Sequence, residues 1–356
     1  MITILDRYLV RAVVTGTALV LLVLLALSAF INFVGEFDKI GTGDFQMPDA
    51  MMYVLLRLPT QAFDMLPVAA LIGALFALGN LASGSELIVM RGSGMSIARI
   101  ARSISIAGVL LALLAAALGE LIAPPSEQFA RSERTRLLNR QVSIAGNAST
   151  WVKDENRIVN VRELNEEQRA AGVFLFTFDD SYELRSIGRA ASARIDARQR
   201  WLLQEYRETK FTDAGVETDA ESLALRTSRL NPEVLSLSVI DPERLASRNL
   251  LSYIRYLKDG ALETRSYEVA VWSRAATVFS VLVMTLLSLP FVFGSLRAAG
   301  TGQRLLIGVV LGIGYFLGSK MMLNSGEVFN LNPFLTAWLP TLILMFATAL
   351  ALARVK

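Results

Sequence analysis

Hydrophobic positions in this chain are concentrated in six long runs, which fall into two groups of three. Each run is about 20 residues long and carries almost no charge, as in a helix that crosses a bilayer. The runs cover residues 12–34, 62–82, 104–123, 269–294, 305–322 and 334–353. The pattern predicts six transmembrane helices, three within residues 1–123 and three within residues 267–356.

The first two runs differ from the others at their ends. The first is too long for the apolar region of a signal peptide, and no A-x-A site precedes the acidic stretch at residues 35–49. We therefore expect it to be retained. The second run follows Pro59 and contains Asp64 and Pro67, so a kink or break is expected at its outer end.

Between the third and fourth runs, the hydrophobic period changes from that of helices to that of strands. Apolar and polar residues alternate in five segments separated by polar turns, at residues 149–152, 157–162, 172–178, 183–197 and 201–209. Helical patterns flank these segments at 127–139 and 241–258. We expect residues 124–266 to form an antiparallel β-sandwich or jelly-roll-like domain, and the fold class to be an α+β membrane protein.

The distribution of Lys and Arg predicts the orientation of the chain in the membrane. Nine of these residues fall at one face: Arg7, Arg11, Arg91, Arg99, Arg102, Arg297, Arg304, Arg354 and Lys356. The short loops at the opposite face contain only Lys39. Because cytoplasmic loops retain basic residues, we expect both termini in the cytoplasm and the inserted domain in the periplasm of a double-membraned bacterium.

Composition supports a membrane protein and argues against several other classes. Hydrophobic residues make up 53% of the 356 positions, charged residues 19%, and the mean hydropathy is +0.46. The net charge of +3 is scattered rather than gathered in one stripe, which argues against nucleic-acid binding. Cys and His are both absent, which removes disulfides, thiol nucleophiles, imidazole bases and the commonest zinc ligands. The sequence predicts no catalytic residue, no metal and no cofactor.

The segment at residues 83–102, between the second and third runs, is predicted to contact a cytosolic partner. Ser83 and Glu86 have the spacing of a capping box, so a short helix is expected to begin at Ser83. The run at residues 87–90 is too short to span the bilayer, and it is apolar enough to suit a groove on another protein. Capping alone is the alternative role for Glu86.

Two further sets of residues concern the membrane interior. The fifth run has small-xxx-small spacings, which favour close helix packing within the chain or with a partner, at Gly308, Gly312, Gly314 and Gly318. Ionisable residues close to lipid are expected to face a cavity, an ion partner or the interface; they are Asp64, Glu120, Arg274 and Lys320.

Four short motifs, in order along the chain, carry a resemblance to a known family. They are Leu5-Asp6-Arg7-Tyr8, Ser85-Glu86-Leu87-Ile88-Val89-Met90-Arg91, Gly119-Glu120-Leu121-Ile122-Ala123-Pro124 and Trp272-Ser273-Arg274. The whole chain resembles the lipopolysaccharide export permeases of the LptF/LptG family, and the first and last motifs resemble the LptG branch more than the LptF branch. The resemblance implies a non-catalytic subunit of an ABC transporter in the bacterial inner membrane.

The resemblance also implies partners and site residues. The partners are LptF in a heterodimer, a dimer of the LptB ATPase, and LptC and LptA on the periplasmic side, to which lipopolysaccharide is passed. The chain has no G-x-x-x-x-G-K-[ST] phosphate loop, which agrees with a separate ATPase. The implied ATPase-coupling residues are Glu86, Leu87, Met90 and Arg91. The implied substrate-binding residues are Lys39, Arg131 and Arg134 for lipid phosphates, Phe30 and Phe33 for acyl chains, and Asn32, where some relatives carry a lysine.

Two other functional classes are compatible with this composition. A membrane hydrolase could use Ser319 and Lys320 as a dyad, but adjacent helical residues point about 100° apart and seldom meet. The alternative function is that of a receptor or structural protein whose inserted domain binds a periplasmic ligand. Copurification of an ATPase with the chain separates the permease from the receptor.

Overall fold

The structure is a computed structural model that describes most of the chain. The described residues are 3–138, 150–154, 156–164, 170–179, 181, 183–195, 200–212, 215–227, 242, 245–260, 262–293 and 301–354. They divide into two compact units, Met1–Gln141 with Arg265–Lys356 and Val142–Thr264. We call the first the helical unit and the second the inserted unit.

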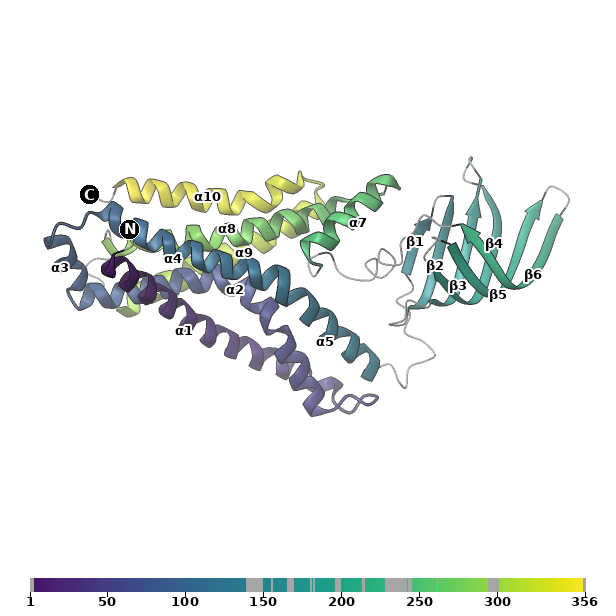
Figure 1. Cartoon of the computed structure of the whole chain (residues 1–356), viewed down its shortest axis with the longest axis horizontal. Coiled ribbons are helices and arrows are strands. Elements are labelled where there is room, and N and C mark those ends of the chain that lie inside the picture. The colour runs from purple at the N-terminus through teal and green to yellow at the C-terminus, as the bar shows by residue number, and fades with distance from the viewer. Residues whose placement is uncertain are drawn as a thin grey trace. The chain divides into compact units, whose positions relative to one another are not determined.

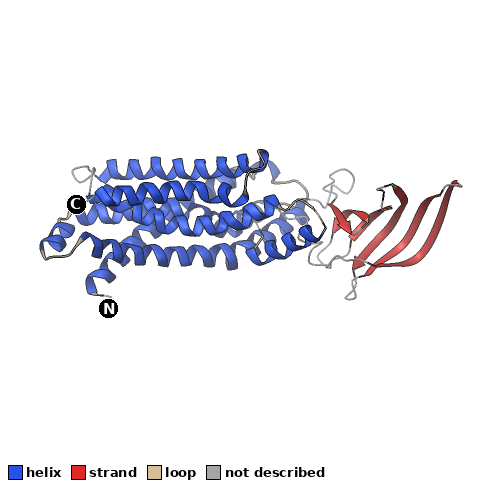
Figure 2. Cartoon of the chain, turned by 90° about the horizontal axis from the view of Figure 1, so that it is seen from above, coloured by secondary structure: helices blue, strands red, loops and turns tan. Residues whose placement is uncertain are grey.

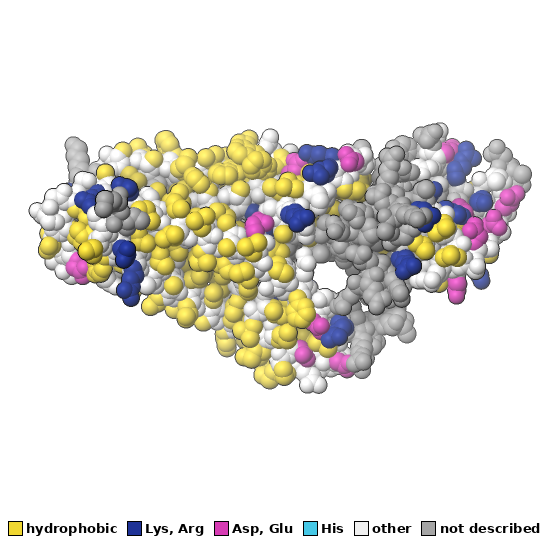
Figure 3. Space-filling view, viewed as in Figure 1, with side chains coloured by type: hydrophobic (Ala, Val, Ile, Leu, Met, Phe, Trp, Pro, Cys, Tyr) yellow, Lys and Arg dark blue, Asp and Glu magenta, His cyan; other side chains and the backbone are white. Residues whose placement is uncertain are grey.

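The helical unit contains six helices long and apolar enough to cross a membrane, as the sequence predicts. They are built on α1 (Ile4–Val34), α2 (Met47–Ser83), α4 (Ile97–Ala117), α8 (Arg265–Phe293), α9 (Thr301–Val328) and α10 (Pro333–Arg354). The helices lie side by side, and both termini lie at the same end of the bundle (Figures 1 and 2). Hydrophobic side chains cover the middle of this unit, while charged side chains gather toward its ends (Figure 3). This distribution is that of a protein solvated by lipid around its middle.

The second and third helices are longer than their apolar runs. The sequence predicts a kink or a break at the outer end of this run, and because helix α2 is helical without interruption through Pro59 and Pro67, no break occurs. Helix α4 continues through a π-helical turn, η2 (Leu118–Ile122), into α5 (Ala123–Leu138). Two prolines follow this turn, and their missing N–H groups account for the local change in hydrogen-bond spacing. Because α5 continues α4, residues 124–138 belong to the helical unit rather than to the inserted one.

Glycines set the closest helix contacts of the bundle. Where α1 crosses α2, a Cβ atom on Gly73 would lie 2.4 Å from the Thr17 Cα atom, and one on Gly16 would lie 2.6 Å from the Gly73 carbonyl oxygen. The two backbones meet there without intervening side chains. In α9, Gly308 and Gly312 instead make room for the Leu75 and Val68 side chains of α2, which makes their small-residue spacing a contact within the chain.

The inserted unit contains one antiparallel sheet with a neighbour-to-neighbour strand order. Its strands are β1 (Thr150–Asp154), β2 (Arg157–Leu164), β3 (Ala170–Phe178), β4 (Leu184–Ile195), β5 (Arg200–Thr212) and β6 (Gly215–Thr227), followed by helix α7 (Ser247–Asp259). The alternation of apolar and polar residues predicts the first five strands but not β6. In the described part of the chain, the six strands form a meander in a single sheet rather than two packed sheets.

One face of this sheet is buried and is organised around large side chains of β5. Trp201 and Leu203 are fully buried, and the Trp201 indole N–H donates to the Asp154 carboxylate at 2.9 Å. Tyr206 lies over Gly188 of β4, where a Cβ atom would be 2.2 Å from the phenol oxygen. Burial raises the pKa of Tyr206 to about 12, so this phenol stays neutral at physiological pH.

Candidate functional site

The end of α1 leads into a short segment that is held against the end of α5. Helix α1 ends at Val34 and is followed by a 3-10 turn, η1 (Phe37–Lys39). The Asp44 backbone N–H then donates to the Leu137 carbonyl of α5 at 3.0 Å. Gly43 has a positive φ of 62°, and a Cβ atom there would lie 2.4 Å from the same carbonyl oxygen. A glycine is therefore needed at the point where this loop meets α5.

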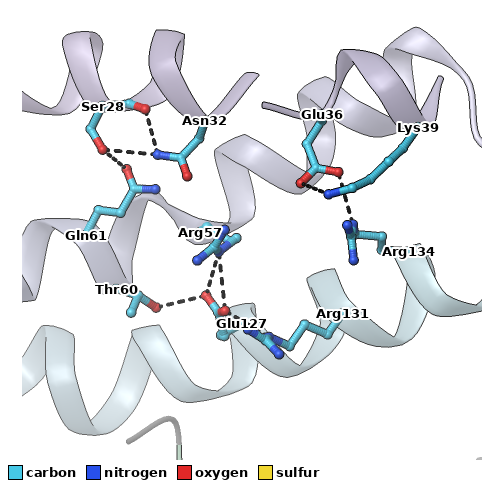
Figure 4. Close-up of polar contacts among 10 residues, drawn as sticks. All are labelled: Ser28, Asn32, Glu36, Lys39, Arg57, Thr60, Gln61, Glu127, Arg131 and Arg134. Carbon is cyan, nitrogen blue, oxygen red and sulfur yellow. Dashed lines mark hydrogen bonds and ion pairs between the residues drawn. The ribbon is translucent and has the colours of Figure 1, made fainter. Parts of the chain in front are cut away.

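This docking brings Glu36 to two cations. The buried Glu36 carboxylate accepts hydrogen bonds from the Lys39 Nζ atom at 3.2 Å and from the Arg134 Nε atom at 3.1 Å (Figure 4). Lys39 is local, but Arg134 comes from α5. Glu36 therefore links the end of α1 to α5 through a charge-assisted contact.

A second buried carboxylate, Glu127 of α5, links α5 to α2 in a similar way. It accepts from the Arg131 Nε atom at 3.0 Å and from the Arg57 Nε atom of α2 at 3.3 Å, with the Thr60 hydroxyl at 3.4 Å (Figure 4). Only 2% of the Glu127 side chain is exposed. A carboxylate at this depth is stable because cations and a hydroxyl surround it.

Tyr53 joins the two carboxylate centres. The guanidinium carbon of Arg134 lies 5.0 Å from the centroid of the Tyr53 ring, and that of Arg57 lies 5.3 Å from it. Both distances are within the range of cation–π contacts. We call Lys39, Arg57, Arg131, Arg134, Glu36 and Glu127 the cation cluster. Four cations against two carboxylates leave it a net charge of +2, which suits an anion.

The structure brings together the three predicted phosphate-binding cations and adds three residues that the sequence analysis missed. Lys39, Arg131 and Arg134 all belong to the cation cluster. The added residues are Glu36, Arg57 and Glu127. Two of these pairings have a local signal, since Glu127 and Arg131 are four residues apart on one helix and Glu36 and Lys39 are three residues apart.

Asn32, Phe30 and Phe33 are placed differently from one another. The Asn32 amide donates to the Ser28 carbonyl at 2.7 Å and to its hydroxyl at 3.2 Å, and the Ser28 hydroxyl donates to Gln61 of α2 at 2.9 Å (Figure 4). Ser28 therefore links α1 to α2, and Asn32 bonds to Ser28 within α1 rather than extending the cluster. Phe33 packs in a small core with Tyr53 and lies against Phe37, whereas Phe30 is 66% exposed on the outside of α1.

The predicted capping box at Ser83 is wrong. Helix α2 continues to Ser83, whose hydroxyl donates to the Gly79 carbonyl within that helix at 2.9 Å. The next helix, α3 (Glu86–Gly92), starts only after Ser85, whose φ of 61° breaks the helical path. Glu86 instead accepts a hydrogen bond from the Tyr8 hydroxyl of α1 at 2.8 Å. The Ser-x-x-Glu spacing spans two helices and is not a cap.

The apolar run of α3 divides between two faces. Leu87 and Met90 are buried in the core of the helical unit, whereas Ile88 and Val89 are exposed. Arg91, at the end of the helix, is also exposed. The surface that α3 offers to another protein is therefore formed by Glu86, Ile88, Val89 and Arg91. The prediction that Leu87 and Met90 belong to this surface is wrong, because both are buried.

Among the ionisable residues near lipid, Arg274 has a defined role. Its Nη1 atom donates to the Gly119 carbonyl at 2.6 Å and lies 3.6 Å from the Glu120 carboxylate. Both acceptors belong to the π-helical turn η2. Arg274 thus ties α8 to the irregular turn of the third span, where a carbonyl would otherwise lack a donor inside the membrane.

Comparison with known proteins decides the family. Residues 7–354 match the model of the family described as lipopolysaccharide export system permease LptF/LptG. The chain belongs to the LptF/LptG family. It is 31% identical to the lipopolysaccharide export system permease protein LptG of Escherichia coli (strain K12), over 95% of this chain and 94% of that protein. It is 30% identical to the protein of the same name from Haemophilus influenzae, over 96% of each chain.

Membership of the LptF/LptG family confirms the resemblance drawn from the four motifs, including its LptG branch. It also agrees with the architecture of six apolar helices around an inserted antiparallel sheet. This LptF/LptG family member is accordingly a multi-pass inner-membrane protein with a role in transport.

Proposed function

We propose that this chain is the transmembrane permease subunit of an ABC transporter that extracts lipopolysaccharide from the inner membrane. The observation that carries the proposal is the cation cluster, with its net charge of +2, at one end of an apolar bundle. Lipopolysaccharide has the matching chemistry, because anionic phosphates lie directly above its acyl chains. Lys39, Arg131 and Arg134 would contact the phosphates, and the exposed Phe30 would contact acyl chains.

The proposal includes partners that supply energy and receive the lipid. LptF would complete the transmembrane pathway, an LptB dimer would hydrolyse ATP, and LptC and LptA would carry lipopolysaccharide onward. The exposed Ile88 and Val89 of α3 suit a groove on LptB, and the sequence has no phosphate loop of its own. The relatives' names, which assign them to a lipopolysaccharide export system, support a multi-subunit assembly.

Two measurements on one preparation test this function. The chain is coexpressed with the proposed subunits, extracted in mild detergent and assayed for a bound ATPase and for lipopolysaccharide crosslinked to the permease. We expect both to be present, and lipid release to depend on ATP. A chain that copurifies with neither would be better explained as a receptor.

The hydrolase alternative finds no support in the geometry of α9. The Ser319 hydroxyl is buried and has no hydrogen-bonding partner among the residues that the structure describes. It therefore makes no hydrogen bond to Lys320, although a serine–lysine dyad requires one for proton transfer.

The proposed orientation predicts which positions an impermeant reagent reaches. The chain lacks cysteine, so single substitutions Thr42→Cys, Glu217→Cys and Ser93→Cys report one position each. All three positions are exposed. In intact cells with a permeabilised outer membrane, an impermeant maleimide should label Thr42→Cys and Glu217→Cys but not Ser93→Cys. Labelling of Ser93→Cys before lysis would reverse the orientation.

Coupling to the ATPase is expected to depend on the charge of Glu86. Replacing Glu86 by alanine should reduce the amount of copurified ATPase by about tenfold, because it removes a charge from the interface. Glu86→Gln should fail similarly, although it keeps an acceptor for the Tyr8 hydroxyl. Tyr8→Phe, which removes only that hydrogen bond, should cost about threefold or less. Normal export by Glu86→Gln would mean that Glu86 serves only to hold α3 against α1.

A further inference from the structure

A narrow groove lies between α1 and α2, close to the start of α1 and the end of α2. It has a volume of about 270 Å³, and its walls include Ala12, Thr15 and Gly16 of α1 and Ala77, Asn80 and Leu81 of α2. Small residues at positions 12, 16 and 77 keep large side chains out of this space. The groove is therefore mostly apolar, with polar groups only where Thr15 and Asn80 lie.

The contacts along α1 and α2 show how the residues of the two helices correspond. The Ser28 hydroxyl donates to Gln61 at 2.9 Å, and Gly16 lies against Gly73. Positions 28 and 16 are twelve residues apart, and so are positions 61 and 73, in the opposite direction. The helices are therefore antiparallel, and each residue forward along α1 corresponds to one residue back along α2.

This register brings a polar residue of α2 level with two cations of α1. Asn80 lies level with Leu9, seven residues beyond the contact between the glycines. Arg7 and Arg11 flank Leu9 and are four residues apart, so they share one face of α1. Thr15 lies one turn further along this face, and its hydroxyl donates to the Arg11 carbonyl at 2.8 Å. Arg11 therefore lies at the mouth of the groove that Thr15 lines.

These polar groups are not used within the described part of the chain. Arg7, Arg11 and Asn80 are all exposed. Among the residues that the structure describes, neither arginine forms an ion pair and the Asn80 amide makes no hydrogen bond. The Glu86 carboxylate, which accepts from the Tyr8 hydroxyl, pairs with neither arginine. Two cations and an amide thus remain available at one end of an apolar groove, at a depth where an unsatisfied polar group is costly.

We propose that the groove binds an acyl chain of an anionic glycerophospholipid, whose phosphate contacts Arg7 and Arg11 and whose ester carbonyl accepts from Asn80. Side chains tilt toward the N-terminus of their own helix, so the two guanidinium groups extend outward from the bilayer and the Asn80 amide extends inward. Phosphate, ester and acyl chain follow in the same order in the lipid. Basic residues at a membrane surface also favour anionic headgroups.

This site is separate from the cation cluster and does not depend on the function proposed above. The groove lies near the start of α1, whereas Glu36 and Lys39 of the cluster follow the end of α1. Because α1 is long and apolar enough to cross the membrane, the two sites face opposite leaflets. The phospholipid would occupy the leaflet on the side of the termini and α3, away from the lipopolysaccharide contacts.

The size of the groove favours a lipid chain over a helix of a partner protein. A helix with its side chains is about 10 to 12 Å across, so it could not enter a space of about 270 Å³ between two helices in contact. A partner helix would also need acidic side chains opposite Arg7 and Arg11. A phospholipid supplies a narrow apolar chain and a negative charge in one molecule.

The test measures lipid binding to the delipidated, purified complex by native mass spectrometry. Phosphatidylglycerol and phosphatidylcholine with identical acyl chains are titrated separately. Wild type should show a saturable site that prefers phosphatidylglycerol by about tenfold. Replacing Arg7 and Arg11 together by glutamine should abolish this preference by weakening only phosphatidylglycerol binding. Thr15→Phe, which fills the groove from an exposed position, should weaken the binding of both lipids.

Two substitutions serve as matched controls. Arg354→Gln removes an exposed cation of α10 that forms no ion pair among the described residues. Ala18→Phe adds the same ring to an exposed position of α1 that does not line the groove. We expect both variants to bind the two lipids as wild type does.

Three results would overturn the proposal. An equal loss of phosphatidylglycerol in Arg354→Gln and in the double arginine variant would indicate a general effect of surface charge. Unchanged lipid binding by Thr15→Phe would mean that the arginines contact only the surrounding lipid and that the groove holds no acyl chain. Loss of a copurified membrane subunit from Thr15→Phe, with lipid binding intact, would assign the groove to a partner protein.

Discussion

Replacing Arg131 and Arg134 together by glutamine is expected to reduce lipopolysaccharide loading well beyond tenfold. Hydrogen bonds to charged groups contribute about 1.5 to 3 kcal/mol each. The loss of two phosphate contacts should therefore weaken lipid binding by more than a factor of ten, even when the free energy is reduced to allow for solvent exposure. Both side chains are partly exposed and already held by buried carboxylates, at 3.0 Å and 3.1 Å. The measurement is photocrosslinking of lipopolysaccharide to the purified complex, at equal expression and equal ATPase assembly.

Glutamine is the informative replacement because the surroundings are acidic. A glutamate at position 134 would lie beside Glu36, and one at position 131 beside Glu127. Charge reversal would therefore disturb the packing of α5 as well as the ligand site. Arg136→Gln on the same helix serves as the control and should load normally. Wild-type loading by the double variant would mean that Arg131 and Arg134 only anchor α5 at the membrane surface.

Replacing Gly73 by alanine is expected to have the largest effect on the stability of the bundle. The new Cβ atom would lie 2.4 Å from the Thr17 Cα atom and 2.5 Å from the Thr17 N atom. Both are backbone atoms of α1, so the clash can be relieved only if α1 and α2 move apart. Overpacking of this kind costs about 1 to 3 kcal/mol or more. The detergent-solubilised chain should therefore show a clearly lower thermal midpoint and a reduced yield.

Gly318→Ala is the matched control for this prediction. Gly318 also lies within a transmembrane helix, but a Cβ atom there would meet no heavy atom within 4 Å among the described residues. Its replacement should leave the thermal midpoint of the chain unchanged. If Gly73→Ala melts at the same temperature as Gly318→Ala, the α1–α2 crossing is looser than the structure indicates.

Local patterns were sufficient for the six spans and for five of the six strands. The six spans follow from uninterrupted apolar length, because a helix satisfies its backbone hydrogen bonds within one segment and needs only a lipid-compatible surface. The strands followed from alternation, and their meander order joins sequence neighbours through short turns. The missed strand β6 is the polar edge strand, whose apolar positions Val216, Leu223 and Leu225 are largely exposed.

Patterns that depend on a helix boundary were less reliable. Ser83 and Glu86 have capping-box spacing. However, Ser85 between them has a positive φ, so Ser83 ends α2 and Glu86 begins α3. The two prolines in α2 predicted a kink or a break, and the helix is not broken at either proline. Proline in a helix interior costs about 3 kcal/mol, and the burial of much of α2 within the bundle offsets this cost.

The sequence by itself determined the six spans, the inserted sheet, the family and three of the four cations in the cluster. Only the tertiary structure identified Arg57 as the fourth cation and the carboxylates that hold the set. Arg57 and Glu127 are 70 residues apart and Glu36 and Arg134 are 98 apart, so no helical or strand period relates them. The Glu36–Arg134 pair forms because the loop that contains Gly43 docks on α5, and the Arg57–Glu127 pair forms because α2 packs beside α5. The packing of these elements, rather than the local sequence, brings the paired residues together.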